Sequence, residues 1–103
     1  MPSNKLADEH FTIKENSWLA KIAARKLKTS SVAIVFGSTI HLWNSSKEDF
    51  LSNKKWLKHE LCHVRQYKQH GYVGFIIKYL WESLRKGYYN NKFEVEAREA
   101  EEK

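Results

Sequence analysis

The pattern HExxH at positions 59 to 63 constrains this chain more than any other stretch of its sequence. The segment around it, from Asn53 to His70, contains neither proline nor glycine, as a helix requires. Residues four apart lie on one face of a helix, so His59 and His63 can converge on one cation while Glu60 lies toward the same open side. Two imidazoles bind zinc, and a nearby carboxylate can take a proton from water. The motif therefore predicts a zinc site of the hydrolase kind.

The neighbours of the motif support this prediction. An apolar arc recurs at helical spacing through Trp56, Leu57, Leu61, Val64 and Tyr67, and Gly71 follows as a stop signal. The alternative is a chance HExxH on a solvated helix, because short motifs carry a false-positive risk. The apolar arc weighs against chance, since histidines beside a buried stripe are costly to leave without partners.

Length and composition predict one small globular domain that spans residues 1–103. The chain is 42% hydrophobic and 14% aromatic, which supplies enough apolar material for one core. Its single cysteine cannot form an internal disulfide, and no apolar run of signal-peptide type precedes the first charges. We therefore expect a reducing, cytoplasmic setting.

The charge balance favours anionic partners without specifying one. The chain has 18 basic and 12 acidic residues, a formal net charge of +6. A basic nucleic-acid-binding protein is one interpretation, but no phosphate loop, RNA-binding aromatic motif or zinc-finger spacing supports it. The longest apolar stretch, residues 72–84, contains Lys78 and Glu82 and falls short of the roughly 20 residues of a membrane span. We expect a buried helix there and no membrane partner.

The remaining sequence predicts a mixed fold around the motif helix. A helix is expected from Asn16 or Ser17 to Lys28, with Trp18, Leu19, Ile22, Ala23 and Leu27 as its apolar face. Residues 32–36 and 39–43 are rich in β-branched and aromatic side chains, and Gly37-Ser38 between them suits a type II′ turn. In that hairpin Val35 faces Ile40 and Ala33 faces Leu42. One long strand with a bulge at Gly37 is the alternative.

The other segments complete an α+β fold of zincin-like type. Residues 1–10 are polar and expected to fray, and residues 44–53 are expected to be a connection that ends in a cap, Ser52 or Asn53. A helix over 73–85 should end by Gly87, a turn should follow at 88–91, and a last helix over 92–103 should bury Phe93, Ala97 and Ala100. The prediction is thus a short β-hairpin or sheet packed on the motif helix, with three further helices.

The third metal ligand is not decided by spacing. His70 lies about 10.5 Å along the helix axis from His63, too far to share a metal, and Cys62 points about a quarter-turn away and suits a small buried residue. The metzincin pattern requires Gly and His where this chain has glutamines at positions 66 and 69. His10 and His41 stay open as candidates. The acidic segment 93–99 offers Glu94 and Glu96, which differ by about 200° on a helix, and periodicity alone does not choose between them.

The motif together with the downstream Glu94-x-x-Ala97 resembles the gluzincin metallopeptidases, and the small size resembles the minigluzincins. The resemblance spans roughly residues 32–100. It implies a zinc-dependent peptidase in which His59, His63 and Glu94 bind Zn²⁺ and Glu60 is the general base, with Glu96 as the second choice of ligand. It also implies that the strand at 39–43 lines the cleft and pairs with an extended peptide or protein substrate.

One departure from the family pattern concerns support of the metal site. Many gluzincins have Asp four residues after the ligand Glu, where it supports a zinc-bound histidine, and this chain has Arg98. Either another acid takes that place or metal affinity is reduced. Tyr88 and Tyr89, which precede the last helix, are candidate donors to the developing oxyanion, although aromatics at such a turn more often pack.

Two functions follow from these residues. The first is a zinc metallopeptidase, active or held latent by a terminal segment that covers the cleft. The second is a non-catalytic binding module that zinc stabilises, because small domains often need a metal as a staple. Glu60 separates them, since a purely structural site does not need a general base.

Overall fold

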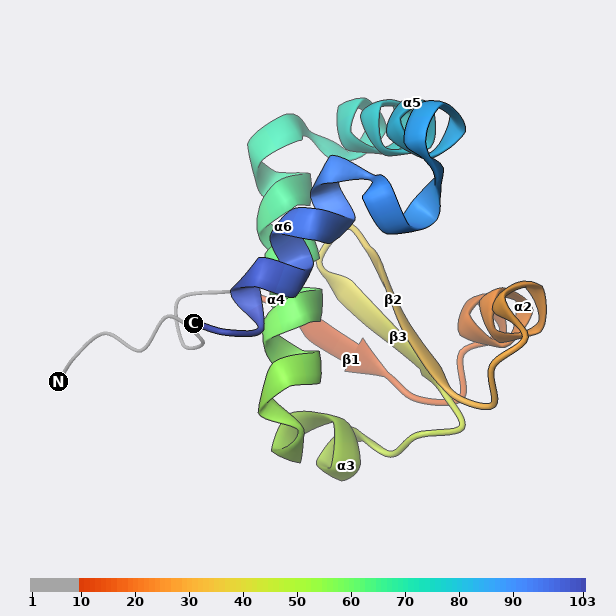
Figure 1. The fold of residues 1–103 in the computed structure, drawn as a ribbon. Helices are drawn as coiled ribbons and strands as arrows, with labels where there is room; N and C mark the ends of the chain where they lie inside the picture. Colours follow the sequence, from red (N-terminus) through yellow and green to blue (C-terminus); the bar gives the residue numbers. More distant parts are fainter. Residues whose placement is uncertain (1–9) are drawn as a thin grey trace, which may run out of the picture.

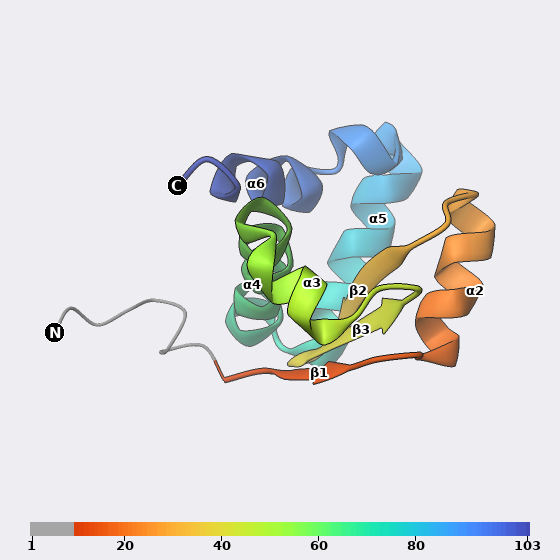
Figure 2. The same ribbon diagram turned by 90° about the horizontal axis from the view of Figure 1, so that it is seen from below.

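A three-stranded sheet forms the centre of the fold, with helices on both of its faces (Figures 1 and 2). The computed structural model describes residues 10–103, so most of the polar N-terminal segment expected to fray lies outside the described residues. The strands are β1 (Thr12–Lys14), β2 (Val32–Phe36) and β3 (Thr39–Trp43), in the order β1-β3-β2. Strand β1 is parallel to β3, and β2 is antiparallel to it.

The predicted hairpin and its register are confirmed. Ala33 pairs with Leu42 and Val35 pairs with Ile40, which places these four side chains on one face of the sheet. Gly37 has a φ of 66°, a left-handed value that suits the first central residue of a type II′ turn. The alternative of one long strand with a bulge is therefore wrong.

Strand β1 was not expected from the sequence. It has only three residues and no buried side chain, so it carries no local strand signal. Its parallel pairing with β3 comes from tertiary packing, and the Thr12 amide donates to the Ser38 carbonyl at the hairpin turn, 3.0 Å away. Because β3 lies between β1 and β2, the sheet edges that no strand covers in residues 10–103 are the outer edges of β1 and β2.

The motif helix α4 (Lys54–His70) packs on the face of the sheet that carries Ile40 and Leu42. Asn53 caps it by accepting a hydrogen bond from the Trp56 amide at 3.1 Å, as one of the two expected caps. The side of α4 that meets the sheet core contributes Leu57, Leu61 and Val64, and burying each such apolar side chain stabilises the fold by about 1.5–3 kcal/mol. The core cluster comprises Ala33, Ile40, Leu42, Phe50, Leu57, Leu61 and Val64.

Helix α2 (Trp18–Leu27) covers the opposite face of the sheet (Figure 2). Its buried residues are Ala20 and Ala24, which allow a close approach to the strands. The expected apolar face is wrong in part, because Trp18 and Ile22 point outward and are 64% and 49% exposed.

A short helix, α3 (Lys47–Ser52), replaces the expected polar connection. The Ser46 side chain caps it by accepting from the Asp49 amide, and Phe50 is completely buried in the core. This helix was not predicted because six residues are too short to show a helical repeat of apolar positions.

Helices α5 (Tyr72–Asn90) and α6 (Lys92–Ala100) complete the chain. Gly87 breaks the helical geometry of α5 at φ 82°, but the chain is again helical up to Asn90, where a turn was expected. Helix α6 ends three residues earlier than expected and buries Phe93, Ala97 and Ala100 as predicted.

The expectation of a buried helix at 72–84 is wrong for half of that segment. Phe75 is buried, but one side of α5 is exposed to solvent. Its large apolar residues there are 57–83% exposed, namely Val73, Ile77, Leu80, Trp81 and Leu84. No described helix is long and apolar enough to cross a bilayer.

Candidate metal centre

Helices α4 and α6 bring three metal-binding side chains to one point. One ligand atom from each of His59, His63 and Glu94 lies within 4.8 Å of the other two. The Nε2 atoms of the two histidines are 3.1 and 3.2 Å from the two carboxylate oxygens of Glu94. Small residues permit this approach, because Cys62 on α4 packs against Ala97 and Ala100 on α6. Cys62 is thus the buried small residue expected from its position.

The other acidic candidate faces a different partner. Glu96 accepts a hydrogen bond from Gln66 Nε2 at 2.7 Å and is not part of the three-residue cluster. This placement separates the two glutamates that periodicity left undecided, and Glu94 is the one beside the histidines.

Glu101 fixes the orientation of the His59 ring. Its Oε2 lies 2.7 Å from His59 Nδ1. A carboxylate only accepts, so Nδ1 carries the hydrogen and Nε2 faces Glu94. Glu101 was not predicted from the sequence as a partner of the site. Its signal was a spacing of seven from Glu94, which returns to nearly the same face of a helix.

Arg98, which stands where gluzincins often have Asp, has a different role. Its guanidinium lies 3.9 Å from the centre of the Tyr89 ring, and it donates to the Tyr89 carbonyl. Tyr89 therefore packs under Arg98, while Tyr88 borders the cleft described below.

Gln66 holds the second histidine through a small network. His63 Nδ1 donates to Gln66 Oε1 at 2.8 Å. The Gln66 amide nitrogen in turn donates to the Phe93 carbonyl at 3.1 Å and to Glu96. These two acceptors fix which way the amide points, so its oxygen must face His63. From the sequence, Gln66 was expected only to rule out the metzincin pattern, and its bond to His63 was not predicted.

Tyr79 of α5 reaches the same site. Its hydroxyl donates to Glu94 Oε2. Burial, followed by the charge of Glu94, raises the pKa of Tyr79 above its ordinary value, so the group remains a donor. Each of the three cluster residues thus has a supporting partner from the protein.

The pKa values of the cluster residues follow from the short distances between the histidines and the carboxylates. Burial alone would lower the pKa of His59, but hydrogen bonds to Glu94 and the charge of Glu60 outweigh it and raise that pKa to about 9. Burial would raise the pKa of Glu94, and the two histidines reverse this and hold it well below the usual range. A cation that binds here would replace the protons on the two histidines as the positive charge beside Glu94.

Glu60 is buried in the wall of the site. It is 6% exposed, and in residues 10–103 no hydrogen bond reaches its carboxylate. Burial raises its pKa to about 7, although the charges of His63 and His59 act in the opposite direction. A buried acid without a hydrogen bond is unusual in folded proteins and commonly has a catalytic, water-binding or ion-binding role.

The donor set suits a metal ion. In a tetrahedral zinc site with bonds of 2.0 to 2.1 Å, neighbouring ligand atoms are about 3.3 Å apart. The two histidine nitrogens lie 3.1 and 3.2 Å from different oxygens of Glu94, close to that value, and one ligand atom from each of the three residues lies within 4.8 Å of the others. Two imidazoles and a carboxylate also bind other divalent metals, so the geometry fits zinc without being specific to it.

A cleft of about 660 Å³ opens over the cluster. His59, Glu60, His63 and Glu94 lie at its polar end, Lys26 also borders it, and most of the other lining residues are aliphatic or aromatic. All five residues of β2 line the cleft, together with residues of α2, α4 and α5: Ala23, Leu27, Tyr67, Phe75, Ile76, Tyr79 and Leu80. The sequence-based expectation that residues 39–43 pair with a substrate is wrong, because β3 has a strand on both sides and the free edge at the cleft is β2.

The remaining histidine candidates lie outside the cluster. His41 Nδ1 is 2.8 Å from the Ser17 hydroxyl, a partner that satisfies this buried side chain. His70 accepts from the Lys78 ammonium at 3.0 Å. His10 is exposed and is not part of the cluster.

Comparisons of the chain with protein-family models, with curated proteins and with solved structures find no match.

Proposed function

We propose that the chain is a zinc-dependent metallopeptidase, of the gluzincin type that its motifs resemble. The observation that carries this proposal is Glu60, a buried carboxylate that has no hydrogen bond within the part of the chain that the structure describes. It lies beside three converging metal-binding side chains at an open cleft. A site that only stabilised the fold would need neither the acid nor the cleft.

His59, His63 and Glu94 would hold the metal, each oriented by its own partner. Bound zinc supplies Lewis acidity, which polarises a peptide carbonyl and makes water more acidic. Glu101, Gln66 and Tyr79 keep the three ligand atoms pointed at one place, so little reorganisation is needed on binding.

The free edge of β2 provides a way to orient the substrate. An extended peptide can pair with an uncovered strand edge through backbone hydrogen bonds, and its alternate side chains then enter neighbouring pockets. The apolar cleft beside β2, with Leu27, Ile76 and Leu80 in its lining, suits apolar side chains of that peptide. We therefore infer a peptide or protein substrate.

Glu60 moves the proton. It accepts a proton from the attacking water as the new C–O bond forms, and it delivers that proton to the amide nitrogen as the C–N bond breaks. The products are a carboxylic acid and an amine, so no oxidant or further reactant is needed. Tyr88, at the border of the cleft, is our candidate for a donor to the carbonyl oxygen.

The test is the Glu60→Gln variant, which keeps size and removes the base. We expect the purified chain with zinc to cleave peptides from a mixed library, detected by mass spectrometry. The variant should bind zinc as tightly as the native chain and lose cleavage by roughly 10²-fold or more.

Two results would overturn the proposal. Full activity of Glu60→Gln would show that the assigned base is wrong. The second is tight zinc binding by the native chain without any cleavage, both before and after removal of the residues that precede β1. The truncation would release an enzyme that this segment keeps latent. A chain that still does not cleave peptides would therefore favour the zinc-stabilised binding module.

A further inference from the structure

Helix α5 exposes an apolar stripe of which only Leu80 also lines the proposed substrate cleft. We define the α5 stripe as Val73, Ile77, Leu80, Trp81 and Leu84, all at least 57% exposed. At 100° per residue these five positions fall within an arc of about 100° on the helix. Exposed apolar surface in one continuous patch marks interaction sites more often than scattered exposed residues do.

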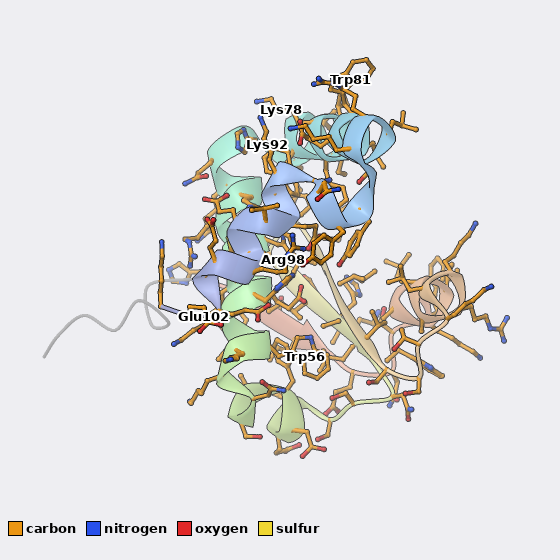
Figure 3. The ribbon with its side chains drawn as sticks, viewed as in Figure 1. Trp56, Lys78, Trp81, Lys92, Arg98 and Glu102 are labelled. Atoms are coloured by element: carbon orange, nitrogen blue, oxygen red, sulfur yellow. The ribbon has the colours of Figure 1, made fainter. Side chains whose placement is uncertain are left out.

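The exposed charges beside the stripe all have one sign. Lys78 and Arg85 lie about 40° to 60° beyond Trp81 around the helix. Figure 3 shows Trp81 and Lys78 on the outer side of α5, away from the sheet. The only acid on α5, Glu82, is buried and accepts from the Lys92 amide at 3.0 Å.

Five of the 12 acidic residues lie together in another part of the molecule. Residues 94–102 contain five glutamates, and Figure 3 shows Glu102 at the far end of α6 from α5. Helix α2, on the other side of the cleft, has no acid and carries Lys21, Arg25 and Lys26 beside its exposed Trp18 and Ile22. The charge of the α5 side is therefore complementary to an anionic surface.

We propose that the α5 stripe binds the surface of an anionic lipid bilayer, with α5 lying in the interface. A helix with an apolar face, a tryptophan at its border and flanking cations is suited to that location, since the aliphatic side chains enter the acyl boundary and the cations contact phosphates. A second copy of this chain fits less well, because α5 packed on α5 would bring Lys78 and Arg85 of both copies together. Leu80 belongs both to the stripe and to the cleft lining, so the cleft opens next to the bound surface.

This proposal does not contradict the absence of a spanning helix, since a helix of this kind lies on the bilayer. The expectation of no membrane partner rested on the length of a span alone. The sequence did not show that one apolar side of α5 is exposed, and the structure does.

Co-sedimentation of the full chain with vesicles tests the proposal. We expect binding to vesicles of phosphatidylcholine and phosphatidylserine in a three-to-one ratio, and much weaker binding to phosphatidylcholine alone. Raising the salt from about 0.1 M to about 0.5 M should weaken the binding to the anionic vesicles, because the cations are exposed.

Paired variants locate the binding surface. Ile77→Ser with Trp81→Ser should reduce binding by roughly tenfold or more, whereas Ile77→Leu with Trp81→Phe should retain it. Lys78→Glu with Arg85→Glu should also abolish most binding. Lys47→Glu with Lys54→Glu makes the same change in net charge on α3 and α4 and should leave most of it intact. Thermal melting of each variant checks that the fold is kept, as expected at exposed positions.

Three results would overturn the proposal. The first is no binding of the native chain to the anionic vesicles. The second is equal binding by the Ile77→Ser with Trp81→Ser variant, which would place the contact elsewhere. The third is a dimer in sedimentation equilibrium that this variant dissociates, which would assign the α5 stripe to a second copy.

Discussion

Glu101 lies outside the HExxH motif but controls one of its histidines. Its carboxylate accepts the Nδ1 hydrogen of His59 and lies in the last turn after α6. We predict that Glu101→Ala weakens zinc binding by about 10- to 100-fold, because the ring loses its fixed orientation. A competitive zinc titration measures this.

A neighbouring glutamate is the matched control. Glu102 pairs with Lys55 at the surface, 3.5 Å away, and both side chains are largely exposed. Glu102→Ala removes the same charge and should leave zinc affinity nearly unchanged. Equal losses in the two variants would mean that net charge, and not the hydrogen bond to His59, is what matters.

The same titration separates the two glutamates of α6. Glu94→Ala removes a proposed ligand and should weaken zinc binding by more than 100-fold, beyond the losses typical of supporting residues. Glu96→Ala removes only a partner of Gln66 and should cost about tenfold at most. The reverse order would move the third ligand to Glu96.

At this scale the sequence could predict His59, Glu60 and His63, because a helix dictates their geometry. It could not choose Glu94 over Glu96 from periodicity, since both border the packed side of α6. Glu101 and Gln66 were not foreseen because their roles depend on how α4 packs on α6, which is a tertiary feature.

Among the secondary-structure elements, the β2–β3 hairpin depends on its glycine turn. Gly37 has a φ of 66°, and a Cβ there would lie 2.5 Å from the Tyr72 ring. The ring is half exposed and can move, so the main cost of Gly37→Ala is the left-handed backbone, about 1–2 kcal/mol. Denaturant unfolding should show this loss in the free energy of unfolding.

Gly74 provides the control for Gly37. It lies in α5 without a positive φ, and nothing lies within 4 Å of a Cβ built there. Gly74→Ala should stabilise the protein by about 0.4–1 kcal/mol. A loss of stability in Gly74→Ala as large as that in Gly37→Ala would show that backbone conformation is not the cause.

Elements with a strong local pattern could be predicted, and those that depend on packing could not. The hairpin and α4 have clear periodicity and turn signals. Strand β1 has three residues and is defined only by pairing with β3, and α3 is a single capped turn and a half. The outward stripe of α5 was misjudged because an apolar run does not tell which of its sides is covered.

At the scale of the whole molecule, the proposed metal site joins helices from distant parts of the chain. His59 and His63 come from α4, and Glu94 comes from α6, near the C-terminal end (Figure 1). The unfolded chain does not hold these side chains together, so metal binding adds to the stability of the fold. The same three residues thus connect a proposed activity with folding.

We therefore predict that zinc raises the melting temperature of the chain. At a free zinc concentration of 100 times Kd the stabilisation is about 2.7 kcal/mol, which for a domain of about 100 residues corresponds to roughly 10–20 °C. Calorimetry with zinc and then with excess chelator measures this shift and its reversal. Elemental analysis of the zinc-loaded chain should give about one zinc per molecule.

Glu60→Gln should keep the shift in melting temperature, because that residue is a base and not a ligand, whereas His59→Ala should lose it. An equal shift in His59→Ala would place the stabilising metal at another site, and no shift in the native chain would remove the basis for a zinc enzyme.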